Sequence, residues 1–276
     1  MKIIALECGG ASSSLVALET WGQTANLLGE FAIDEPRALS RLLIERFDLV
    51  LRAAKWKVSD LDGLAIGIGP GSWTSLRIGI SSFKTLAQTL KIPLAGVPSL
   101  DALAAAVYKS KREAASQKIT RSGKSNARKS KSASKSADFD AQILLALSPC
   151  RPGEFYGKVF EMTAHSLSVG QSEWIASAPL HISAAFCQGL ASEIEPPLFL
   201  CGDAAPEVGK LLGARGEIYD IGNASSSELA LEIALAGAAQ IMQGQADNPL
   251  DVKPIYLAPS HAERYLAQKN GGVYSS

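Results

Sequence analysis

Several features that would place the sequence in a common protein class are missing. No apolar run approaches the ~20 residues that a membrane-spanning helix needs. The first apolar run, Ile3 to Leu6, stops at Glu7, so we expect no secretory signal. The 4 cysteines are far apart and form no CxxC pair, which argues against a zinc ribbon, a thioredoxin-type site and a disulfide framework. We therefore expect a cytoplasmic globular protein with no membrane partner.

The net charge is also zero, but the charges are unevenly distributed. Ten of the 27 basic residues and one of the 27 acidic residues lie between Lys109 and Ala137, so 17 basic and 26 acidic residues remain elsewhere. This tract is rich in Lys and Ser and poor in large apolar residues, which predicts a disordered insertion over 109–137. Two interpretations stay open: contact with the phosphates of a polyanion such as tRNA, or a tolerated loop that adds solubility.

Residues 1–108 are predicted to form a first lobe with the element order βββαβαβα. Alternating apolar residues bounded by glycine turns indicate the strands, and an early proline and a capping serine mark two helix starts. The predicted strands are Ile3–Glu7, Ser13–Leu18, Thr24–Ile33, Leu64–Ile68 and Leu94–Val97, and the predicted helices are Pro36–Ala54, Thr74–Leu90 and Ser99–Tyr108.

The same element order recurs after the tract. We assign 138–224 to a second lobe and 225–276 to a C-terminal helix that packs back between the lobes, followed by a tail. That helix begins at a capping box formed by Ser225 and Glu228, and it is apolar nearly all round, so it should be buried. The predicted strands are Gln142–Leu147, Glu154–Glu161, Leu167–Ile175, Leu198–Cys201 and Glu217–Ile221, and the helices are His181–Ile194, Pro206–Leu212 and Ser225–Gln243.

Two βββαβαβα halves resemble the actin, Hsp70 and sugar-kinase architecture, so the predicted fold class is α/β and actin-like with two lobes. In that architecture phosphates sit in the cleft between the halves, held by the turns between the first two strands of each half. The corresponding candidates, as vestigial phosphate turns, are Glu7, Gly9, Gly10, Gly202 and Asp203. Glu7 is interpreted either as a metal or phosphate-site residue or as a solvated acid in a turn.

The most distinctive segment is GIGPGSWTSLRIG, from Gly67 to Gly79. Gly-Pro-Gly favours a tight turn because proline fixes φ while glycine tolerates positive φ. Ser72 or Thr74 can cap the helix that follows. The segment is neither a Walker A loop nor a GxGxxG turn. By its residues alone it is either an anion site at a helix N-terminus or simply a turn and a capped helix.

This segment resembles a motif of the TsaB (YeaZ) family, whose common form is roughly GPGSFTGLRIG. Three more segments match that family in order: RPGEFY from Arg151, CGDAA from Cys201 and PIYLAPSHAE from Pro254. The resemblance covers nearly the whole chain except the Lys/Ser tract. The motif turn is formed by Gly69, Pro70, Gly71, Ser72, Trp73 and Thr74. The sequence departs from the family at Glu7, Ala38-Leu39, Ser75 and Pro149, which puts any retained nucleotide binding in doubt.

The resemblance implies a non-catalytic subunit in the synthesis of N6-threonylcarbamoyladenosine at position 37 of tRNAs that read ANN codons. Its implied partners are a TsaD-type transferase, a TsaE-type ATPase, a second copy when alone, and tRNA through the complex. No cofactor is implied, and ATP or ADP at the heterodimer interface stays open. The implied partner surface lies on the first two long helices, with candidates Leu39, Leu42, Leu43, Arg46, Leu76, Arg77, Ile80 and Phe83. The alternative is that these apolar stripes belong to the lobe's own core.

A catalytic subunit of the TsaD type needs a paired-histidine HxxxH helix for its metal. The 3 histidines here, His165, His181 and His261, are never four residues apart. We therefore expect no catalytic residue and no metal site. The alternative function, a free-standing ATP-dependent kinase or hydrolase, rests on the fold order and the glycine turns, and fold is weak support for chemistry.

Overall fold

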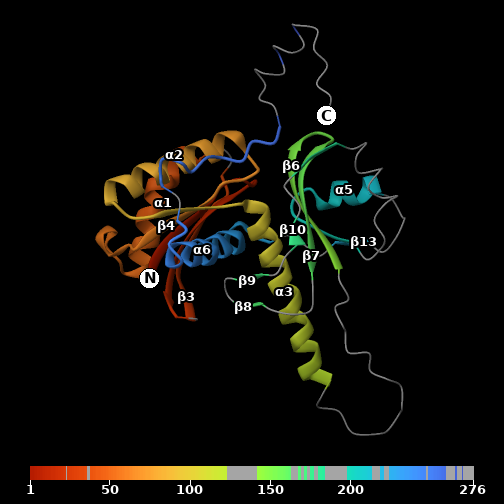
Figure 1. Cartoon of the computed structure of the whole chain (residues 1–276), viewed down its shortest axis with the longest axis horizontal. Helices are drawn as coiled ribbons and strands as arrows, with labels where there is room; N and C mark the ends of the chain where they lie inside the picture. The colour runs from red at the N-terminus through yellow and green to blue at the C-terminus, as the bar shows by residue number, and fades with distance from the viewer. Residues whose placement is uncertain are drawn as a thin grey trace.

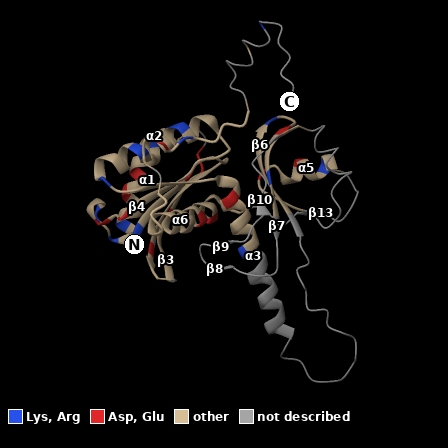
Figure 2. Cartoon of the chain, in the orientation of Figure 1, with Lys and Arg blue, Asp and Glu red and all other residues tan. Residues whose placement is uncertain are grey.

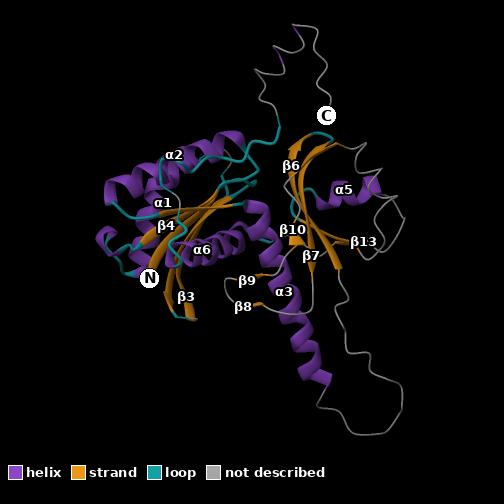
Figure 3. Ribbon diagram, viewed as in Figure 1, coloured by secondary structure: helices purple, strands orange, loops and turns teal. Residues whose placement is uncertain are grey.

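The computed structural model shows two α/β lobes, each built on its own sheet (Figures 1 and 3). The structure describes residues 1–22, 24–35, 38–122, 142–162, 167–168, 171–172, 175–176, 180–183, 198–212, 218–220, 224–246, 248–258, 265 and 269.

The first sheet has the strand order β3-β2-β1-β4-β5. Strands β1 to β3 form an antiparallel meander, and β1, β4 and β5 run parallel. Strand β1 is central, so its side chains are buried on both faces. The strands are β1 (Lys2–Glu7), β2 (Ser13–Trp21), β3 (Thr24–Ile33), β4 (Gly63–Gly67) and β5 (Leu94–Val97).

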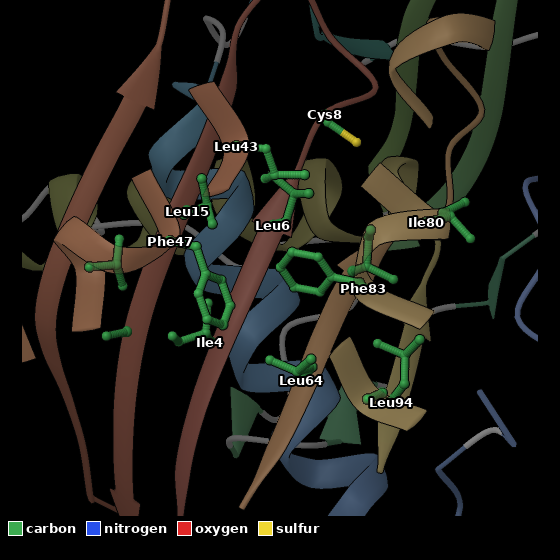
Figure 4. Close-up of a cluster of buried hydrophobic side chains, with 14 of the residues drawn as sticks. Ile4, Leu6, Cys8, Leu15, Leu43, Phe47, Leu64, Ile80, Phe83 and Leu94 are labelled. Carbon is green, nitrogen blue, oxygen red and sulfur yellow. The ribbon is translucent and has the colours of Figure 1, made fainter. Parts of the chain in front are cut away.

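Helices cover both faces of this sheet. Helices α1 (Leu39–Ala54) and α2 (Trp73–Leu90) lie on one face, and a short 3₁₀ helix, η1 (Val58–Asp60), follows α1. Their apolar stripes pack against the alternate side chains of β1, β2 and β4 (Figure 4). Helix α6 (Ser226–Met242) packs on the opposite face.

The second sheet has the order β10-β7-β6-β12-β13, and β11 pairs with the other part of β7. Helix α3 (Ser99–Ser122) packs on one face through apolar residues near its start, and α5 (Ala205–Leu212) packs on the other. The strands are β6 (Gln142–Arg151), β7 (Glu154–Met162), β10 (Ile175–Ala176), β11 (Leu180–Ser183), β12 (Leu198–Cys201) and β13 (Ile218–Asp220), with a separate pair β8 (Leu167–Ser168) and β9 (Gln171–Ser172).

Two helices of the first lobe differ from the prediction. Helix α1 begins at Leu39 with Ala38 as its cap, while Pro36 lies outside the described residues. Helix α3 does not end near Tyr108 but continues to Ser122, so residues 109–122 of the predicted insertion are helical. The reason is that Lys, Arg, Glu and Ala favour helix and that extending a helix is far easier than nucleating one. Residues 123–137 lie outside the described residues.

The second lobe requires two further corrections. The predicted strand Leu167–Ile175 is divided among the short strands β8, β9 and β10. The predicted helix His181–Ile194 does not begin at His181, which instead pairs with Tyr156 in the β11–β7 ladder. Residues 184–194 lie outside the described residues.

The C-terminal helix has the predicted capping box but packs mainly on the first sheet. The Ser225 hydroxyl accepts a hydrogen bond from the Glu228 amide, and the Glu228 carboxylate accepts one from the Ser225 amide. Helix α6 also contacts α3, which links the two lobes. None of the helices within the described ranges is long and apolar enough to cross a bilayer.

Candidate functional site

A cavity of about 170 Å³ lies between the two lobes. Its walls come from the β1–β2 turn, the start of α3, the ends of β6 and β12, and the start of α6. The structure brings all the candidate phosphate-turn residues to this one cavity: Glu7, Gly9, Gly10, Gly202 and Asp203.

Glu7 is buried inside the first lobe and is not the solvated acid that one interpretation expected. Its side chain is 1% exposed. One carboxylate oxygen accepts a hydrogen bond of 2.5 Å from the Gly9 amide, and the other accepts one of 2.9 Å from the Ser99 hydroxyl. Burial raises the pKa of Glu7, while the hydrogen bonds from Gly9, Ser99 and the Cys8 amide oppose that rise. A side chain at position 67 would overlap this carboxylate, so Gly67 provides the space that Glu7 occupies.

The motif turn holds neighbouring segments together at the edge of the cavity. The Ser72 amide donates to the Gly9 carbonyl at 2.8 Å, and the Ser99 amide donates to the Gly69 carbonyl at 2.9 Å. Gly71 packs so closely on Gly9 that a Cβ atom there would overlap the Gly9 carbonyl. Gly69 has a φ of +88°, which glycine adopts without strain. These contacts give the motif turn a structural role, and only Pro70 of its members lines the cavity among the described residues.

Of the two predicted cap residues in this turn, the structure uses Ser72. Its hydroxyl accepts the Ser75 amide at the start of α2. Ser99 was also predicted to cap its helix, but it lies in the first turn of α3 and its hydroxyl donates to Glu7.

Most of the candidate partner-contact residues lie in the core of the first lobe. Leu39, Leu43, Leu76, Ile80 and Phe83 are all at most 4% exposed. Figure 4 shows Leu43, Ile80 and Phe83 in this core. All five residues pack on the first sheet, so for them the core alternative is correct. Leu42 and Arg46 are partly exposed and Arg77 is exposed. The width of the apolar stripes on α1 and α2 therefore could not tell residues of the lobe's own core from residues that contact a partner.

Sequence reasoning did not identify an aromatic cluster formed by Trp73, Arg77 and Tyr256. The Trp73 and Tyr256 rings stack with centroids 3.9 Å apart. The Arg77 guanidinium lies 4.2 Å from the Trp73 ring centroid, and its Nε donates to the Tyr256 hydroxyl at 3.0 Å. Trp73 and Tyr256 each lie in a segment that matches the same family. The matches of these two segments were the feature of the sequence that could have suggested a contact between them.

The remaining candidates form no metal site within the part of the chain that the structure describes. Among the described residues, no three His, Cys, Asp or Glu side chains are grouped to hold a metal ion. The backbone of His181 lies in β11, whereas His165 and His261 are outside the described ranges. Of the positions that depart from the family pattern, Ala38 is buried and Ser75 is partly buried.

Comparisons with known proteins find sequence similarity to TsaD and TsaB proteins. The TsaD family, described as tRNA N6-adenosine threonylcarbamoyltransferase, matches residues 34–120. The chain is 31% identical over 109 residues to the tRNA threonylcarbamoyladenosine biosynthesis protein TsaB of Escherichia coli (strain K12), covering 40% of this chain and 45% of that protein. It is 50% identical over 46 residues to TsaB of Bacillus subtilis (strain 168), covering 17% and 20%. The chain thus spans less than half the length of these curated relatives.

The similarity in fold extends further than the similarity in sequence. A crystal structure of an uncharacterised protein from Pseudomonas aeruginosa, with similarity to peptidase YEAZ, matches with a TM-score of 0.64 and 18% identity. The match covers 93% of this chain and 99% of that chain. The predicted two-lobed α/β fold class is confirmed.

Proposed function

We propose that the chain is a member of the TsaB/YeaZ family and acts as a non-catalytic scaffold subunit, which the partial sequence matches to TsaB and the shared fold support. It pairs with a TsaD-type threonylcarbamoyltransferase for the formation of N6-threonylcarbamoyladenosine at position 37 of ANN-decoding tRNAs. In this proposal a TsaE-type ATPase and tRNA join through the complex, and the chain forms a homodimer when alone. Any ATP or ADP would be held at the heterodimer interface.

The observation that supports the non-catalytic role is the size of the cavity between the lobes. At about 170 Å³ the cavity is smaller than the ~300 Å³ at the low end of ligand pockets, which favours a role without a nucleotide bound there. Glu7 stands at the position of a phosphate-site residue, and its two carboxylate oxygens already accept hydrogen bonds from Gly9 and Ser99. The sequence also lacks the paired histidines of a TsaD-type metal site.

A partner surface is supported by the partly exposed stripes on α1 and α2, two helices that contact each other. Three apolar residues on these stripes, Leu42, Ile78 and Leu86, pack against the core but are not covered completely. Arg46, one turn after Leu42, has a buried Nε atom without a hydrogen-bond partner among the described residues. The rest of the Arg46 side chain is partly exposed beside Leu42, so its charge is available to a partner subunit.

Size-exclusion chromatography with light scattering tests this proposal, with the full chain alone and mixed with the TsaD subunit of the same organism. We expect a homodimer that exchanges into a heterodimer. Arg46→Glu should weaken the pairing at least tenfold. Arg52→Glu is the matched control, because it makes the same charge change on α1 where Arg52 pairs with Asp48 at the surface. A monomer that does not associate with TsaD would contradict the proposal.

The alternative, a free-standing ATP-dependent kinase or hydrolase, is favoured by one observation: the candidate phosphate-turn residues line the same cavity. ATP turnover by the chain alone, abolished in Glu7→Gln, would support the enzyme. No turnover by the folded chain would exclude it.

A further inference from the structure

Helix α3 has an anchored first part and an extended second part. Leu100, Leu103 and Val107 are buried in the core cluster beside the second sheet. Lys109 then forms an ion pair with Glu232 of α6 at 3.4 Å. The helix backbone continues to Ser122, past the edges of both sheets (Figures 1 and 3). At 1.5 Å per residue, the part after Tyr108 adds roughly 20 Å of helix.

The extended part, residues 109–122, is basic on a chain that is otherwise acidic. It contains Lys109, Lys111, Arg112, Lys118 and Arg121 but one acidic residue, Glu113. Outside 109–137 the chain has 26 acidic and 17 basic residues. Helix α6 carries Glu228 and Glu232 and no Lys or Arg, whereas α1 carries charges of both signs (Figure 2). A polyanion is therefore attracted to this helix more strongly than to the rest of the chain, which is acidic on balance.

The composition of the extended part favours phosphates over a lipid surface. A helix that binds a membrane surface needs a wide apolar face, and Ile119 is the one large apolar residue in 109–122. A helix that is polar all round, with excess Lys and Arg, suits contacts to a nucleic-acid backbone, which position the ligand without reading its sequence.

We propose that residues 109–122 of α3 form an RNA-docking arm that binds the phosphate backbone of tRNA directly. The polyanionic class follows from the charge of the helix, whereas its identity as tRNA rests on the proposed function. The arm adds a tRNA contact from the scaffold subunit itself, separate from the surface on α1 and α2.

Fluorescence anisotropy with a labelled, unmodified tRNA transcript tests the arm in the full chain at 50 and 200 mM KCl. The neutralised variant carries Lys111→Gln, Arg112→Gln, Lys118→Gln and Arg121→Gln. We expect at least tenfold weaker binding at 50 mM KCl. The slope of log K against log [KCl] should fall by about 2 to 4, because each lost phosphate contact removes ~0.9 from it.

Two control variants sharpen the result. The charge-preserving variant Lys111→Arg, Arg112→Lys, Lys118→Arg and Arg121→Lys should bind tRNA as the wild type does. Arg41→Gln with Arg52→Gln, which removes charge from α1, should also leave binding unchanged. An unchanged slope in the neutralised variant would overturn the arm. Binding of phosphatidylserine vesicles in preference to tRNA would overturn it as well.

The same variants separate this inference from the proposed function. The neutralised variant should still form the heterodimer with TsaD, because the arm lies away from α1 and α2. If the wild-type chain binds tRNA through the arm but fails to pair with TsaD, the proposed function is wrong and the arm remains. If it pairs with TsaD but the neutralised variant binds tRNA normally, the arm is wrong and the proposed function remains.

Discussion

Ser99 and Glu7 are 92 positions apart in the sequence, and the Ser99 hydroxyl donates a hydrogen bond of 2.9 Å to the buried Glu7 carboxylate. The same hydroxyl accepts the Gly69 amide at 3.2 Å. Ser99 therefore connects the end of β1, the motif turn and the start of α3.

Ser99→Ala should destabilise the protein because it leaves two buried groups, the Glu7 carboxylate and the Gly69 amide, without this partner. We expect a loss of about 1–3 kcal/mol in the free energy of unfolding, measured by urea denaturation. Ser81→Ala, at an exposed position on α2, is the control and should stay within about 0.5 kcal/mol of wild type. Equal stability of the two variants would show that the Ser99 hydroxyl is not needed for folding.

Glu7 predicts a particular dependence of stability on pH. Its pKa in the folded state lies above the ordinary value of 4.5, so between these two values the folded state binds more protons than the unfolded state. The contribution of Glu7 to stability is therefore fully present below about 4.5 and is lost as pH rises through the folded pKa. Each unit of pKa elevation corresponds to about 1.4 kcal/mol.

Glu7→Gln removes this titration. The difference in unfolding free energy between wild type and Glu7→Gln should shift in favour of wild type as pH falls from neutral towards 4.5, measured by urea denaturation at each pH. Taking the difference matters because burial also raises the pKa of Glu232. A difference that is constant with pH would show that Glu7 titrates normally.

Two helical glycines should respond to alanine in opposite directions. A Cβ atom at Gly237 in α6 would overlap the Ala65 side chain of β4, whereas at Gly209 in α5 the nearest atom is Leu200 Cδ1 at 3.6 Å. Alanine favours helix over glycine by about 1 kcal/mol. Gly209→Ala should therefore stabilise the protein by up to about 1 kcal/mol, and Gly237→Ala should destabilise it by about 1–3 kcal/mol through overpacking. Thermal unfolding of both variants checks this, and stabilisation by Gly237→Ala would show that α6 is not so close to the sheet.

The local pattern of the sequence was enough to predict the elements that contain most of the core. The first five strands alternate or are continuously apolar, and the Ser225–Glu228 pair marks the start of α6. The pattern did not predict which sheet α6 covers, because an all-round apolar helix fits any face. It also did not predict that Glu7 is buried, because the groups that make this possible, Gly67 and Ser99, come from distant segments.

The sequence left two interpretations of the stripes on α1 and α2 open for a related reason. Ile80 and Phe83 are apolar and helical in spacing whether they face a partner or the lobe's own sheet, and only the fold distinguishes these cases. For that reason Ile80→Glu would unfold the lobe rather than test a partner contact, whereas Arg46→Glu tests it at a partly exposed position.

Lys84 should control the stability of the segment 248–258 where it runs along α2. Its Nζ donates to the carbonyls of Leu250 and Val252 at 2.8 and 3.0 Å. Lys84→Ala removes both bonds, and we expect local opening to become easier by about 1 kcal/mol, which corresponds to roughly fivefold faster cleavage. Limited proteolysis with chymotrypsin, followed at Tyr256, measures this rate.

Lys253→Ala is the matched control for this prediction, because it removes an exposed lysine from the same segment. It should be cleaved at the wild-type rate. Buried Val252 and the hydrogen bond of 2.8 Å from the Ile255 amide to the Ile68 carbonyl still anchor the segment in both variants, so global stability should change little. Equal cleavage rates for Lys84→Ala and Lys253→Ala would mean that the other contacts of the segment, including those of Tyr256 with Trp73 and Arg77, hold it without Lys84.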